Sequence, residues 1–118
     1  MNRQQRIEAL QKALGSLDSA IARLQAALQA SVDPDEINRL TSQLADLQAE
    51  QQSVQFQVDN LQMDAGEIAD ISPENAAKIR TLSADLDRAI VTAATVSGTL
   101  DFANTVLGKA SEMRSALA

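Results

Sequence analysis

Residues 7–61 decide the fold, and they read IEALQKALGSLDSAIARLQAALQASVDPDEINRLTSQLADLQAEQQSVQFQVDNL. Apolar residues recur there at alternating intervals of three and four, in two runs on either side of Val32-Asp33-Pro34. The first run consists of Ile7, Leu10, Leu14, Leu17, Ile21, Leu24 and Leu28, and the second of Ile37, Leu40, Leu44, Leu47, Val54, Val58 and Leu61. Seven-residue repeats of this length are typical of helices that pack along their whole length.

The segment between the two runs carries the signals of a helix start. Asp33 fits an N-cap, and Pro34 at the first helical position loses no hydrogen bond, because an amide there has no partner within the helix. Glu36 completes a variant of the capping box; the acidic cluster lacks the spacing and the glycine of a calcium loop. If the second helix runs antiparallel to the first, each apolar residue faces a partner related to it by symmetry about Pro34, as Leu24 faces Leu44. The periodicity and the cap therefore place the turn at the same residue.

A third amphipathic run follows Ser72-Pro73-Glu74, where serine again fits an N-cap and proline the first helical position. The sequence predicts an all-α fold in one domain, residues 1–118: an antiparallel three-helix bundle, formed by a coiled-coil hairpin and a long third helix. The three predicted helices cover residues 2–31, 34–66 and 73–116.

The third helix is predicted to pair antiparallel with the second, with Val58 facing Leu82 and Leu47 facing Ala93. In that register the segment from Asn104 onward projects beyond the turn between the first two helices. The alternative is that the last helix bends back at Gly98 or Gly108 and buries this surface within the chain.

Composition restricts the chemistry that the chain can perform. It has no cysteine and no histidine, which removes disulfides, thiolate zinc sites and the usual acid–base group near neutral pH. Carboxylates remain as candidates, but pairs such as Asp85 and Asp87 fall beside the core stripe, and the four glycines form no phosphate-binding loop. We therefore expect a non-enzymatic protein with no cofactor and no metal site.

Charge is distributed unevenly along the chain, whose net charge is −6. Residues 31–72 contain nine acidic side chains and a single basic one, Arg39. An acidic middle segment repels phosphate backbones, so we expect no nucleic-acid partner. Two interpretations remain open, a solvated face that keeps the protein soluble and a docking surface for a basic partner. The sequence shows no signal peptide and no segment apolar enough to span a membrane, so the expected location is the cytoplasm.

Gln51 is the one polar residue on the apolar stripe of the second helix. A lone polar residue at such a position commonly sets the register or the oligomeric state of a helical assembly. We expect Gln51 to have this structural role in the core.

The back of the third helix carries apolar residues that the predicted seam does not use. They are Ile90, Val91, Ala94, Gly98 and Phe102, joined on the projecting segment by Val106, Leu107, Met113 and Leu117. Phe56 also lies off the predicted core. Apolar surface left outside a bundle indicates a contact surface.

These residues predict a structural or interaction module, such as an assembly, adaptor or chaperone-like subunit. It would form a homo-oligomer or bind a helical protein partner. The alternative function is a helical protein that is active at membranes or other hydrophobic surfaces and uses residues 89–107.

Overall fold

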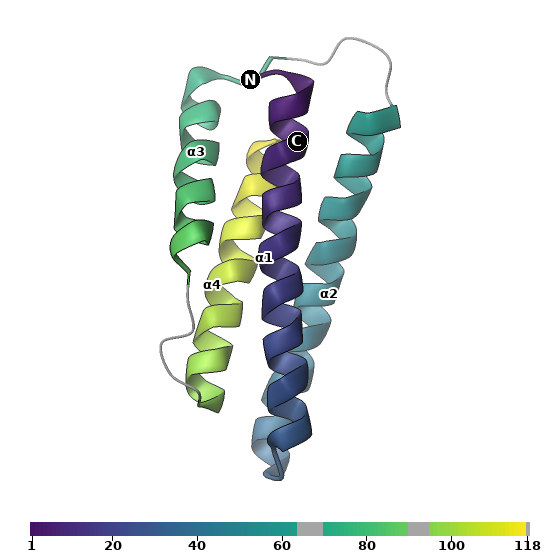
Figure 1. Ribbon diagram of the computed structural model, residues 1–118, viewed down its shortest axis with the longest axis vertical. Coiled ribbons are helices and arrows are strands. Elements are labelled where there is room, and N and C mark those ends of the chain that lie inside the picture. The colour runs from purple at the N-terminus through teal and green to yellow at the C-terminus, as the bar shows by residue number, and fades with distance from the viewer. Residues whose placement is uncertain (64–69, 90–94, 118) are drawn as a thin grey trace.

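The computed structural model describes residues 1–63, 70–89 and 95–117, and these residues contain four helices. The helices are α1 (Arg3–Ala30), α2 (Pro34–Met63), α3 (Pro73–Arg88) and α4 (Val96–Ala116). They alternate in direction and form an elongated helical bundle of 52 × 25 × 15 Å (Figure 1). The prediction of an all-α fold is confirmed.

Two of the helix starts are those that the sequence predicts. The Asp33 carboxylate accepts a hydrogen bond of 2.9 Å from the amide of Asp35, directly before α2. The Ser72 hydroxyl accepts one of 3.1 Å from the amide of Asn75, with proline at the start of α3. Each bond satisfies an amide that has no acceptor within its own helix.

The arrangement of the helices differs from the predicted three-helix bundle. α1 and α4 lie antiparallel at the centre, α2 packs against both on one side, and α3 packs against both on the other (Figure 1). α2 and α3 do not contact each other, so the predicted pairing of Val58 with Leu82 is wrong. Ala93, the predicted partner of Leu47, lies outside the described residues.

The single helix predicted over residues 73–116 is also wrong, because α3 ends at Arg88 and α4 begins at Val96. Neither Gly98 nor Gly108 is the point where the direction changes. The Thr95 hydroxyl caps α4 by accepting a hydrogen bond of 3.0 Å from the amide of Gly98. The last helix therefore returns along α1 and does not project beyond the hairpin.

Burial explains why α4 lies where it does. The buried residues of this helix are Thr99, Ala103, Val106, Ala110, Met113 and Ala116, and the C-cap residue Leu117 is buried as well. On α1, Ala13 and Ala20 are also buried, and small side chains at such positions allow a second helix to approach closely. α4 thereby removes from water the apolar surface that a projecting helix would expose.

Two ion pairs join α3 to the helices at the centre. Lys12 on α1 lies 2.7 Å from Asp87, and Lys109 on α4 lies 3.3 Å from Asp85. Both carboxylates that the sequence offers as metal-ligand candidates on this helix are therefore paired with lysines. The Lys12–Asp87 pair is largely exposed, so we assign it a role in orientation and little net stabilisation.

Gly108 lies in the interior of α4, on its exposed side, and a Cβ atom added there meets no atom within 4 Å. Glycine in a helix interior costs about 0.5–1 kcal/mol relative to alanine, because the unfolded chain has more backbone freedom to lose. Gly108→Ala is therefore expected to raise the free energy of unfolding by that amount, measured by urea denaturation. A destabilised variant would reveal a close contact at Gly108 that the single chain does not contain.

Candidate functional site: a groove beside Phe102

Because α3 is shorter than α1, α3 covers only part of the central helix pair. α1 has 28 residues and α3 has 16, which correspond to lengths of about 42 Å and 24 Å. α3 therefore covers the N-terminal part of α1 and ends at Arg88, while α1 continues beyond it (Figure 1).

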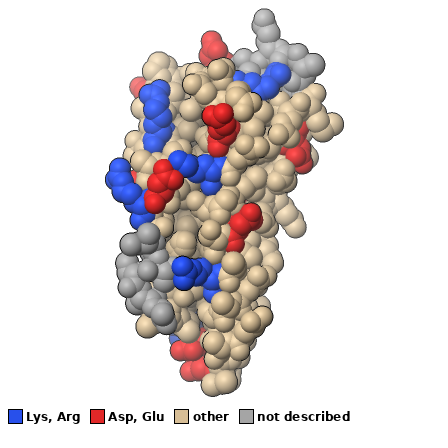
Figure 2. Space-filling view, in the orientation of Figure 1, with Lys and Arg blue, Asp and Glu red and all other residues tan. Residues whose placement is uncertain are grey.

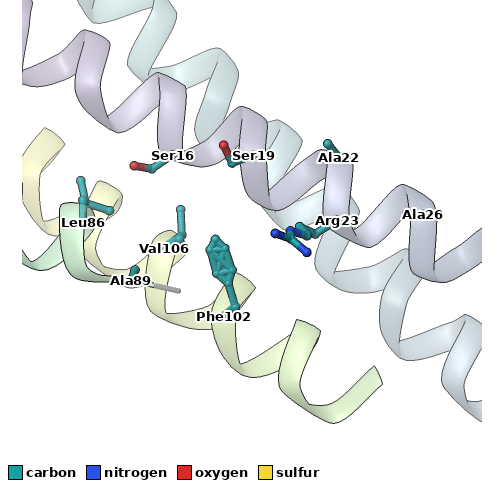
Figure 3. A pocket seen from close by; sticks show the side chains of 9 residues that line it. All are labelled: Ser16, Ser19, Ala22, Arg23, Ala26, Leu86, Ala89, Phe102 and Val106. Atoms are coloured by element: carbon teal, nitrogen blue, oxygen red, sulfur yellow. The ribbon is translucent and has the colours of Figure 1, made fainter. Parts of the chain in front are cut away.

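A groove of about 510 Å³ lies where α3 ends, between α1 and α4. We name it the Phe102 groove, and its lining residues are Ser16, Ser19, Ala22, Arg23, Ala26, Leu86, Ala89, Phe102 and Val106. Figure 3 shows the Phe102 ring standing on α4 and directed toward α1, with the Arg23 side chain beside it. On the α1 side, the lining residues are the small Ser16, Ser19, Ala22 and Ala26, together with Arg23.

The chemistry of this groove favours binding over catalysis. Among the described residues that line the groove, Arg23 is the one ionisable side chain and none carries a carboxylate. Serine hydroxyls without an adjacent base are weak nucleophiles. Small side chains next to an aromatic ring are instead suited to contact with another protein.

The structure divides the predicted contact residues into three groups. Val106 and Met113 are fully buried and Leu117 is 4% exposed, so the prediction that these three form an external interface is wrong. They are buried because α4 folds back into the core. Gly98, Phe102 and Leu107 are partly exposed on α4. The remaining predicted residues, Ile90, Val91 and Ala94, lie outside the described part of the chain.

Gln51 lies at the edge of the core and is half-buried. Its side-chain amide donates a hydrogen bond to the Asp18 carboxylate, which joins α2 to α1. α3 does not contact α2, so Gln51 does not face Ala89 as the three-helix register requires. The role of Gln51 in setting register stays a prediction, now with Asp18 as its partner.

The ion pair between Glu50 and Arg114 is a polar feature that sequence reasoning missed. The Nε of Arg114 donates a hydrogen bond of 2.7 Å to one oxygen of Glu50, and a terminal guanidinium nitrogen donates one of 3.3 Å to the other. Only 9% of the Glu50 side chain is exposed, against 35% of that of Arg114. The hydrogen bond with Glu50 raises the pKa of Arg114, while burial opposes it, so this side chain is charged at any pH at which proteins are studied. Glu50 lies beside the apolar stripe in sequence, and spacing alone does not reveal that the end of α4 covers it.

Comparison with known families, characterised proteins and solved structures finds no match for this chain. None of the helices in the described ranges combines the length and apolar character needed to cross a membrane. Within the same ranges, acidic side chains nowhere gather in threes in a way that could hold a metal ion.

Proposed function

We propose that this protein is a non-enzymatic structural or interaction module, in which two copies associate through their Phe102 grooves. The observation that carries the proposal is the partly exposed Phe102 ring beside the serine and alanine wall of α1. Aromatic side chains contribute most to binding when they fill a pocket near the centre of an interface. Phe102 of each copy would pack against Ser19 and Ala22 of the other, as a two-fold interface requires.

The distribution of charge supports this side of the molecule as the surface of self-association. Residues 73–118 carry five acidic and five basic side chains, and residues 1–30 carry four basic and two acidic ones. Two copies that meet through the groove between α1 and α4 would therefore keep their acidic α2 helices apart. Like charges brought together at an interface would oppose association.

The alternative, binding of residues 89–107 to a membrane or another hydrophobic surface, requires part of α4 to leave the bundle. That movement would expose Ala103 and Val106, which are almost completely buried. The loss of their packing opposes such a release, so we favour the protein interface.

Substitutions in the groove test the proposal by their effect on molecular mass in solution, measured by light scattering coupled to size exclusion over a range of concentrations. The wild type is expected to form a dimer, and Phe102→Ser a monomer. Ala22→Arg, at an exposed position of α1, is expected to have the same effect because its long side chain fills the groove.

Each variant has a matched control on α2, away from the groove. Phe56→Ser and Ala45→Arg make the same chemical changes at exposed positions and are expected to remain dimeric. Circular dichroism checks that every variant is still helical. A wild type that is monomeric at all concentrations, or groove variants that dimerise like their controls, would refute self-association through the Phe102 groove.

A further inference from the structure

The exposed side of α2 carries a second aromatic residue, Phe56, which does not pack in the core of the bundle. Its side chain is largely in solvent, with 67% of the residue exposed, and Met63 two turns further along α2 is 82% exposed. Two hollows flank Phe56, one of about 450 Å³ toward α1 and one of about 800 Å³ toward the end of α4. Phe56 lines both and forms the ridge between them. This pair of hollows is separate from the Phe102 groove.

The hollow toward α1 is acidic. Asp18 and Asp59 line it together with Leu14, and in the part of the chain that the structure describes none of its lining residues carries a positive charge. Each carboxylate accepts a hydrogen bond from a glutamine, Asp18 from Gln51 and Asp59 from Gln55. An ionised carboxylate can accept about four hydrogen bonds, so both retain acceptor capacity toward a cation.

The hollow toward α4 has a different character. Ala49, Leu61 and Leu117 contribute apolar surface to it. Arg114, the one charged residue among the described residues that line it, is already paired with Glu50. This hollow is suited to an aliphatic or aromatic side chain.

We propose that the Phe56 surface, formed by Phe56 and the two hollows beside it, binds a basic amphipathic helix of a partner protein. A large apolar side chain of that helix would enter the hollow toward α4. An arginine or lysine would lie across the Phe56 ring and reach Asp18 and Asp59, combining a cation–π contact with charge-assisted hydrogen bonds. A helix that presents apolar and basic residues on adjacent faces satisfies both hollows at once.

The charge of the protein favours a basic helix over a second copy of the chain as the ligand of the Phe56 surface. The protein has a net charge of −6, and the segment that contains α2 has nine acidic residues and one basic residue. In Figure 2 the right-hand side, where α2 lies, is mostly uncharged with isolated acidic side chains, and more of the visible basic side chains lie toward α3. Two copies that met through α2 would bring like charges together, while a basic helix would neutralise them.

A synthetic peptide provides the probe. It has about 18 residues, roughly 27 Å as a helix, with leucines on one face, lysines and arginines on the adjacent face, and a single tryptophan. The protein contains neither tryptophan nor tyrosine, so the fluorescence of the peptide reports binding directly. We expect the emission to shift to shorter wavelength on addition of protein, and the affinity to fall as salt is added.

Three variants locate the binding site. Phe56→Ser and the double variant Asp18→Asn/Asp59→Asn are each expected to weaken binding by about tenfold or more. Asparagine keeps the acceptor oxygens that Gln51 and Gln55 use, so the bundle should be undisturbed. The double variant Asp46→Asn/Asp101→Asn removes the same charge at exposed positions outside the hollow, and it should bind nearly as the wild type does.

The outcomes separate this proposal from self-association through the Phe102 groove. Phe102→Ser should bind the basic peptide with unchanged affinity, whether or not it dimerises. Equal binding of a peptide with glutamates in place of the basic residues would overturn the proposal, as would equal affinities of the two double variants. Self-association of the wild type that is lost in Phe56→Ser would show that a second copy occupies this surface, and would also overturn it.

Discussion

Met113→Ala is expected to lower the free energy of unfolding by about 2–5 kcal/mol, the range for truncation of a large buried side chain. Met113 lies near the end of α4 and is completely buried among the helices of the bundle. The substitution removes apolar surface from the core and leaves a cavity, which the surrounding helices fill only in part. Chemical denaturation followed by circular dichroism measures the change.

Met63→Ala is the matched control, because Met63 lies at the end of α2 with 82% of its surface exposed. A substitution at such a position is expected to change the free energy of unfolding by no more than about 0.5 kcal/mol. The comparison also discriminates between folds, since a projecting last helix would leave both methionines in solvent. Equal effects of the two substitutions would contradict the packing of α4 in the core.

The hairpin of α1 and α2 could be predicted from the sequence because two independent signals agree. The apolar repeat fixes which residues of each helix face inward, and the capping residues at Asp33 and Pro34 fix where the chain turns. Both signals are local, and a turn of three residues forces the second helix to run antiparallel to the first. The buried positions Leu24, Leu40 and Leu47 lie on the predicted stripe.

The division between α3 and α4 could not be predicted from periodicity. The interval of three and four residues continues without interruption through Leu86, Ala89, Ala93 and Val96, so the repeat alone indicates one helix. The signal for a new helix was Thr95, whose hydroxyl caps α4, but threonine is common and is a weak marker without a proline beside it. Whether the last helix projects from the bundle or folds back onto it is decided by how much apolar surface becomes buried. That amount depends on the packing of all the helices.

The candidate site was predictable only in part for the same reason. Phe102 and Phe56 were placed outside the core because they lie off the apolar stripes, and both are at least partly exposed. The groove beside Phe102 exists because α3 ends at Arg88, so it depends on the break that the repeat conceals. Val106 was assigned to the outer surface because the last helix was expected to project from the bundle. It becomes a core residue only because α4 folds back along α1.

Substitutions of Glu50 and Arg114 are expected to have unequal effects, because the two partners differ in burial. Arg114→Met keeps most of the apolar stem but leaves the buried Glu50 carboxylate without its cation; because Arg114 is partly exposed, we expect a cost of about 2 kcal/mol, below the ~3–5 kcal/mol of a fully buried pair. Glu50→Gln should cost less, about 1 kcal/mol, since Arg114 is partly exposed and can turn toward water.

The double variant Glu50→Gln/Arg114→Met should be more stable than Arg114→Met alone, because it no longer contains an unpaired buried charge. The difference between the effect of the double variant and the sum of the single effects gives the coupling energy of the pair, measured by urea denaturation of the four proteins. We expect a coupling of at least about 1 kcal/mol, within the range for residues in direct contact. Additive effects would mean that this pair does not hold the end of α4 against α2. In that case the position of Arg114 and Leu117, which line the hollow beside Phe56, would not be fixed by the ion pair.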